Sequence, residues 1–331
     1  MSAILAPLDS TAPRRSVSRL FALAAFAAFA LFAVAAVRSA PEGTFAKLRS
    51  ADPLLLGAGS AAYALAFLFR GARLNLLLPE EGRIPAARAW SLSAASLFLV
   101  QVVPLRGGEI ATWAAIRAAL GTGWLRSGAV FVAAKMVDTA VLVLAGLTGA
   151  AVALVSGDAP VFGAAAWGAV AAGGALLLLA PRLAGQAAGW LAGRFPDGSR
   201  GARLAREVSD ALLVARQSPR RYLAAVTMAA ATTAMHVGAI FLMLRGLRID
   251  VSLAGIALAL FLSALAFSSI PSPFGNFGPA ETGFTAGLTL AGIPVPVGLV
   301  ASVILHVLLT LSSGLAGLPF LVRYGGKVFS E

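Results

Sequence analysis

Apolar runs follow one another along nearly the whole chain. Some contain no charged residue, at 20–37, 53–69, 89–105, 161–180 and 251–270. Others carry only isolated ionisable groups, at 128–156, 222–244 and 295–322. A helix of about 20 apolar residues spans the hydrocarbon core of a bilayer. The pattern therefore predicts an all-α polytopic membrane protein, a helical bundle with a single transmembrane domain over residues 20–322.

Two of these runs are interrupted in the same way, by proline and glycine at 104–109 and at 271–281. After each break come a short apolar helix, a glycine turn and a long helix, which carries Asp138 in the first case and His306 in the second. Broken helices at membrane depth survive only inside protein or beside water, and paired breaks point to a transporter-like site. Chance is the alternative, because both residues are frequent in membrane helices.

The paired breaks define the predicted topology. We predict about six full spans plus two re-entrant helical hairpins, one within each of two repeat halves at 53–156 and 222–322. Placing basic loops on one side of the membrane puts the two hairpins on opposite faces. The halves then form an inverted repeat.

The composition supports a membrane protein and changes how the positive net charge is interpreted. The chain is 59% hydrophobic and 12% charged, its mean hydropathy is +0.87 and its net charge is +12. In such a chain, basic residues mark cytoplasmic segments and meet anionic lipids, so nucleic acid is not an expected partner. We place both tails (1–19 and 323–331) and the arginine-rich loop 182–221 on the cytoplasmic side of a bacterial inner membrane. The same rule assigns a further cytoplasmic loop to Arg70, Arg73, Arg83 and Arg88.

Two segments allow more than one interpretation. Residues 20–37 follow three arginines, as a signal peptide would, but the apolar run is long and its cleavage site is poor, which favours an uncleaved anchor. Residues 202–217 fit an amphipathic helix on the membrane surface or a plain solvated connector.

The residue inventory argues against several chemistries. The chain has no cysteine and two histidines, and it shows no phosphate-binding loop, zinc spacing or nucleophile motif. We therefore expect no enzyme activity, no metal and no cofactor, and we expect any transport to be passive or ion-coupled.

The first interruption contains the strongest candidate site. Arg106, Glu109 and Arg117 lie on one helical stripe, beside the backbone donors of Gly107 and Gly108. A helix N-terminus with an arginine suits a phosphate group. Glu109 would pair with an arginine or carry a proton. The alternative is an Arg–Glu pair that only caps the helix end.

The second interruption offers a matching acid. Glu281 follows a proline that suits the first position of a helix. It would carry a proton or face a cation across a central cavity, or it would simply interact with the helix dipole. Gly275 and Asn276 would present polar groups to the same ligand, although glycine-rich turns are common.

The long helices carry the remaining candidates for coupling or support. Lys135 and Asp138 are three positions apart, which predicts an internal ion pair, with Asp138 also able to reach the cavity. His306 either titrates near neutrality or is a hydrogen-bonding packing residue. We expect His236 to be structural.

A family resemblance rests on two signatures. The first is the Pro-x-Arg-Gly-Gly-Glu run at 104–109, which continues through Arg117 to Lys135-x-x-Asp138. The second is the turn at 271–281, which is followed by a Gly-x-Pro turn. Together they resemble the lysylphosphatidylglycerol synthase transmembrane (flippase-like) family, over about residues 51–322.

This sequence departs from the family pattern at two positions. Thr112 stands where the family often has a basic residue, and His306 stands near a common arginine. The resemblance implies lipid handling, because family members move modified lipids between leaflets or accompany lipid pathways. Full synthases carry a separate soluble aminoacyl-transfer domain, for which this chain has no room, so we expect no synthase activity.

Three functions follow as hypotheses. The first is a translocase or transport component for a phospholipid, glycolipid or isoprenoid-type lipid, with an anionic headgroup as ligand. The second is a membrane scaffold or accessory subunit for a lipid-modifying enzyme, docked through the arginine-rich loop. The third is an ion-coupled transporter of a small anion.

Overall fold

The computed structural model is helical throughout the part of the chain that it describes. That part comprises residues 34, 38, 46, 49–78, 82–103, 107–155, 172–173, 183–199, 201–203, 205–206, 209–210, 218–270 and 277–328. The main elements are α3 (Pro53–Leu77), α4 (Ala86–Val102), α5 (Gly107–Leu120), α6 (Trp124–Val155), α9 (Pro219–Gly246), α10 (Leu253–Ser269), α11 (Pro279–Leu290) and α12 (Val295–Val328). The predicted runs 20–37 and 161–180 lie almost wholly outside the described residues.

Four helices in the described ranges are long and apolar enough to cross a membrane. They cover Pro53–Leu77, Trp124–Val152, Pro219–Gly246 and Val295–Gly325, and each corresponds to a predicted span. The apolar helix Leu253–Ser269 is shorter. The prediction of a polytopic helical membrane protein is therefore confirmed in its coarse form.

The sequence explains where several helices begin and end. The Asp52 carboxylate accepts the N–H groups of Leu54 and Leu55 at 2.9 and 3.3 Å, which caps α3. Proline occupies the first turn of α3, α9 and α11, where no N–H is needed. Gly121 after α5 and Gly292 after α11 have φ of 63° and 89°, so glycine ends both short helices.

Both interrupted runs form helical hairpins. α4 packs against α5, and α10 packs against α11. Glycine allows the two helices of each hairpin to approach closely. A Cβ on Gly108 would lie 2.4 Å from the Leu99 carbonyl oxygen, and a Cβ on Gly283 would lie 2.3 Å from the Leu262 carbonyl oxygen. The paired breaks in the sequence thus correspond to paired hairpins in the structure.

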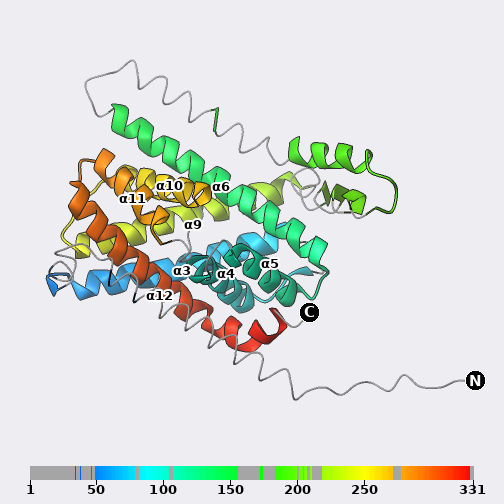
Figure 1. Cartoon of the computed structure of the whole chain (residues 1–331), viewed down its shortest axis with the longest axis horizontal. Helices are drawn as coiled ribbons and strands as arrows, with labels where there is room; N and C mark the ends of the chain where they lie inside the picture. The colour runs from blue at the N-terminus through cyan, green and yellow to red at the C-terminus, as the bar shows by residue number, and fades with distance from the viewer. Residues whose placement is uncertain are drawn as a thin grey trace, which may run out of the picture.

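Each long helix packs against the hairpin of the other half of the chain. α6 lies along α10, and α12 lies along α4 (Figure 1). α3 and α9 pack extensively against each other. Glycine permits both approaches, because a Cβ on Gly149 or Gly317 would come within 2.5 Å of α10 or α4 backbone. The two largest apolar clusters lie around α4 and α5 and around α10 and α11.

The boundaries of two elements correct the sequence interpretation. Arg70 and Arg73 lie within α3, not in the predicted loop. The helix continues past Phe69 because four leucines follow, and a partner on α6 neutralises the arginines. α12 runs to Val328, so it includes the start of the predicted C-terminal tail 323–331. The predicted loop 182–221 is described only in part.

Candidate functional site

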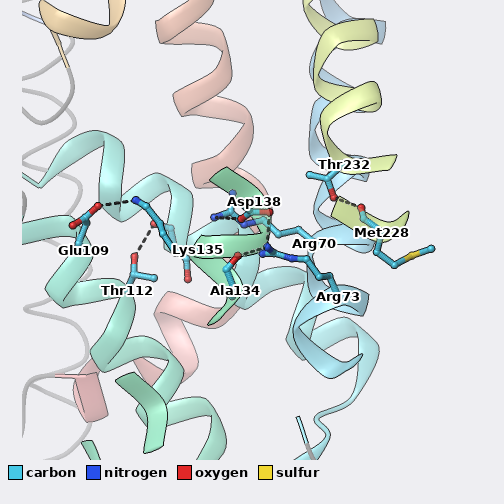
Figure 2. Close-up of polar contacts among 10 residues, drawn as sticks. Arg70, Arg73, Glu109, Thr112, Ala134, Lys135, Asp138, Met228 and Thr232 are labelled. Atoms are coloured by element: carbon cyan, nitrogen blue, oxygen red, sulfur yellow. Dashed lines mark hydrogen bonds and ion pairs between the residues drawn. The ribbon is translucent and has the colours of Figure 1, made fainter. Parts of the chain in front are cut away.

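Five charged side chains form a row across three helices, which we call the charged ladder: Glu109, Lys135, Asp138, Arg70 and Arg73. Figure 2 shows them in this order, from α5 across α6 to α3. Lys135 Nζ donates to Glu109 Oε1 at 2.7 Å. Asp138 forms ion pairs with Arg73 and, at 3.6 Å, with Arg70.

The predicted pair between Lys135 and Asp138 is wrong. Their spacing does put them on one face of α6, but each reaches to a neighbouring helix. α5 lies on one side and offers Glu109, while α3 lies on the other and offers two arginines. α6 therefore supplies the two central charges that join its neighbours electrostatically.

Arg73 anchors the inner end of the ladder. Its side chain is only 3% exposed. Its Nη1 donates to the Ala134 carbonyl at 2.6 Å and also pairs with Asp138, so both contacts fall on α6. A buried guanidinium is costly unless such partners surround it, which makes this end a fixed part of the bundle.

The other four side chains of the ladder are more exposed than Arg73. The exposed fractions of the side chains are 25% for Arg70, 27% for Asp138, 34% for Glu109 and 43% for Lys135. The ladder holds three cations and two anions, so its formal charge is +1. A partly exposed cluster with one excess positive charge attracts anions.

The other residues of the first predicted site do not all lie near Glu109. Gly107 and Gly108 begin α5, two residues or fewer before Glu109. Arg106 lies outside the described residues. Arg117 is at the opposite end of α5, with its guanidinium 4.8 Å from the Trp124 ring centroid. Thr112 is buried and donates to the Ser96 carbonyl at 3.1 Å, so it fixes the hairpin.

The second predicted site contains a buried acid–imidazole pair, formed by Glu281 and His306 with exposed fractions of 4% and 8%. Glu281 Oε1 contacts His306 Nδ1, and its Oε2 accepts the Gly278 N–H at 2.6 Å. Glu281 thus binds the end of its own helix and the facing side chain on α12. Gly275 and Asn276 lie outside the described residues.

His236 packs among aromatic rings. Its ring centroid is 4.6 Å from that of Tyr63 and 6.1 Å from that of Phe67, both on α3. It therefore helps to join α9 to α3, the role that the sequence suggested.

Comparison with known proteins identifies the family. The family model for the lysylphosphatidylglycerol synthase transmembrane region matches residues 17–317. The chain belongs to this family. No curated protein and no solved structure matches the chain. The family match and the four candidate spans establish a multi-pass membrane protein of a family related to lipid handling.

Sequence reasoning missed Arg70 and Arg73 as members of the site. A signal was present: two arginines three positions apart end an apolar run, and Lys135 and Asp138 show the same spacing on another. Charges with one spacing on two membrane helices suggest a shared interface, since isolated charges there are costly.

Proposed function

We propose that this family member is a lipid translocase or lipid-transport component that receives an anionic headgroup at the charged ladder. The observation that carries the proposal is the excess positive charge of the ladder, set between helices of a membrane family related to lipid handling. A phospholipid, a glycolipid with an acidic group and an isoprenoid phosphate share the required negative charge.

Arg70 is the main headgroup ligand in this proposal. Its ion pair with Asp138 is the longer of the two arginine pairs, and a quarter of its side chain is exposed. A guanidinium offers several N–H donors in one plane, which suits phosphate oxygens. The N-terminus of α5, with Gly107 and Gly108, adds backbone donors near Glu109. Arg106 and Arg117 would hold phosphate during entry and exit.

We further propose that the two halves form an inverted repeat with re-entrant hairpins. The spacing of Asp138, Gly146 and Gly149 on α6 equals the spacing of His306, Gly314 and Gly317 on α12. In both helices the glycines contact the hairpin of the other half. Such repeats permit alternating access by rocking one half against the other around a fixed site.

The proposal also covers the location, the topology and the partners of the protein. We place the protein in the cytoplasmic membrane with both termini and the loop 182–221 in the cytoplasm, following the basic residues. It moves lipid and catalyses no covalent step. Its partners are membrane lipids and, through the arginine-rich loop, a lipid-biosynthesis enzyme.

The test uses purified protein in phosphatidylethanolamine–phosphatidylglycerol vesicles with a fluorescent phosphatidylglycerol. Dithionite destroys the outer-leaflet label, so the rate of further quenching reports lipid movement. We expect Arg70→Gln to slow movement at least about tenfold, because one charged hydrogen bond contributes about 1.5–3 kcal/mol. Arg73 keeps its partners in this variant, so the bundle stays folded.

Arg245→Gln is the matched control. Arg245 also forms a single ion pair from a helix, at 3.2 Å to Asp250, but its side chain is 51% exposed and lies outside the ladder. Equal rates in the Arg70 and Arg245 variants would refute the site. A wild-type protein that moves no lipid would favour the scaffold, whereas uptake of a labelled small anion would favour the solute transporter.

A further inference from the structure

The described part of the arginine-rich loop contains two short helices, which we call the loop hairpin. The first helix covers residues 183–192, and the second falls within residues 201–210 (bright green in Figure 1). The Ser209 hydroxyl donates to the Gly185 carbonyl at 3.1 Å, which joins the second helix to the first. This part of the loop is therefore a folded unit and not a plain connector.

The buried face of the first helix carries only small residues. Gly185, Ala188 and Ala192 are buried, and their spacing of three and four residues puts them on one face. Gly185 on this face also receives the hydrogen bond from the second helix. The hairpin therefore closes through small residues, and its packing uses none of the large apolar side chains of the first helix.

Those large side chains lie on the opposite face, which we call the apolar stripe: Leu183, Ala187, Trp190 and Leu191. The spacing again follows one side of a helix, about half a turn from the buried face. Leu183, Trp190 and Leu191 are between 44% and 59% exposed. Phe195, just after the helix, is exposed as well. A short helix with its large apolar residues outside and its small residues inside presents a surface for another apolar phase or partner.

Arginines accompany the apolar stripe. The Arg194 guanidinium lies 4.1 Å from the centroid of the Trp190 ring, at the end of the stripe. Arg203 and Arg206 are exposed on the second helix. Residues 182–221 contain eight arginines against three acidic residues, so the segment is strongly basic. Tryptophan favours the headgroup level of a bilayer, and arginine binds lipid phosphates, so this charge is complementary to an anionic lipid surface.

One end of the bundle carries the same kind of pair between arginine and an aromatic ring. The Arg117 guanidinium lies 4.8 Å from the Trp124 ring centroid, where α5 ends and α6 begins. The Arg88 guanidinium lies 5.4 Å from the Tyr324 ring centroid, where α4 begins and α12 approaches its end. α4 and α5 form a hairpin, so both pairs lie at one end of the bundle. Such pairs are typical of the boundary between membrane and water.

The loop hairpin is connected to this same end. α9 begins at Pro219, shortly after the hairpin in the sequence. Arg221 in its first turn donates to the Leu78 carbonyl at 2.5 Å, just beyond the end of α3. The short segment that follows Leu78 leads to the start of α4. The chain therefore holds the hairpin near the end of the bundle that has the features of a membrane boundary.

We propose that the loop hairpin binds the surface of an anionic bilayer. The apolar stripe enters the boundary between headgroups and acyl chains, and the arginines contact lipid phosphates. The sequence left residues 202–217 open between a membrane-surface helix and a solvated connector, whereas the structure assigns the apolar surface to the preceding helix. This binding adds to the function proposed for the charged ladder and does not depend on it.

The experiment places one fluorescent label on the stripe of the full-length protein. The chain has no cysteine, so Ala187→Cys can carry a single NBD group and keeps every large side chain of the stripe. The protein is reconstituted in phosphatidylcholine vesicles with or without about one third phosphatidylglycerol. With phosphatidylglycerol, we expect blue-shifted emission and quenching by nitroxide groups on the acyl chains.

A label in the turn of the hairpin is the matched control for position. The Asp197 side chain is 99% exposed, and its ion pair with Arg206 is a surface pair of small energetic value. A label on Asp197→Cys should keep the emission of a group in water and should be quenched by iodide. The two labels together report which face of the hairpin meets lipid.

A pair of arginine variants tests the contribution of charge to binding. Arg206 and Arg245 are both about half exposed and both form a surface ion pair, but Arg245 lies at the opposite end of α9 from the hairpin. Both changes are made in the labelled Ala187→Cys protein, at the phosphatidylglycerol content where half of the label contacts lipid. Arg206→Gln should lower the ratio of lipid-bound to free label about fivefold, and Arg245→Gln should leave it unchanged.

Several outcomes would overturn the proposal. Water-like emission at position 187 in both kinds of vesicle would exclude membrane binding, and equal binding without phosphatidylglycerol would exclude the role of anionic lipid. Emission that shifts without quenching by lipid, and that reverts when the protein is diluted among vesicles, would mean that a second copy covers the stripe. Protection that requires an added soluble protein would mean that an enzyme partner covers it. Since none of these measurements needs lipid movement, this proposal and the proposed function fail independently.

Discussion

The charged ladder and the Glu281–His306 pair occupy comparable places in the two halves of the chain. In both, a short helix that follows a break presents an acid to a long helix, Glu109 to α6 and Glu281 to α12. Yet the ladder is partly exposed and has an excess charge, whereas the second pair is almost fully buried. One architecture thus serves two environments, and we interpret the open one as the ligand site.

The largest expected effect comes from Asp138→Asn. This change leaves Arg70 and the buried Arg73 without a carboxylate. Removing one partner of a buried ion pair costs about 3–5 kcal/mol, so we expect a loss of that size in the free energy of unfolding, measured by SDS titration in mixed micelles. Lipid movement should also stop.

A double variant separates the loss of Asp138 from the loss of stability. Replacing both Asp138 and Arg73 by leucine removes the charges together, which is often neutral for stability. We expect unfolding close to wild type and retained lipid movement, because Arg70 and the formal charge of +1 both remain. Loss of lipid movement in this variant would contradict the excess charge as the basis of headgroup binding.

A smaller effect is expected at the buried pair. Glu281→Ala removes the bond to the Gly278 N–H and the contact with His306, so we expect a loss of about 2 kcal/mol in unfolding free energy. Glu281→Gln keeps an acceptor for Gly278 and should lose less than half of that. Equal losses in the two variants would mean that charge, not hydrogen bonding, stabilises this end of α11.

The smallest effect is expected from Glu109→Gln. The Glu109–Lys135 pair is more than one third exposed, and such pairs contribute about 0.2–1 kcal/mol. We therefore expect little change in unfolding, but a changed rate of lipid movement, because the ladder charge rises by one. A loss as large as that of Asp138→Asn would remove the distinction between the outer and inner ends of the ladder.

The sequence predicted the helices better than it predicted which charged side chains pair with each other. Proline and glycine at 104–109 and 271–281 are local signals, and the structure has helical hairpins at both places. The pairing of charges depends on neighbours far along the chain, so spacing on α6 led to a wrong Lys135–Asp138 pair. The rule for basic loops likewise misplaced Arg73, because it takes no account of an acid on a neighbouring helix that neutralises an arginine.

The glycine contacts of α6 and α12 restrict how a lipid can approach the ladder. At Gly149 and Gly317 the helix backbones touch so closely that a single methyl group would not fit. No fatty acyl chain can slip through those two seams. Under the proposed function, a lipid would therefore approach Arg70 from a side of the bundle other than these two contacts.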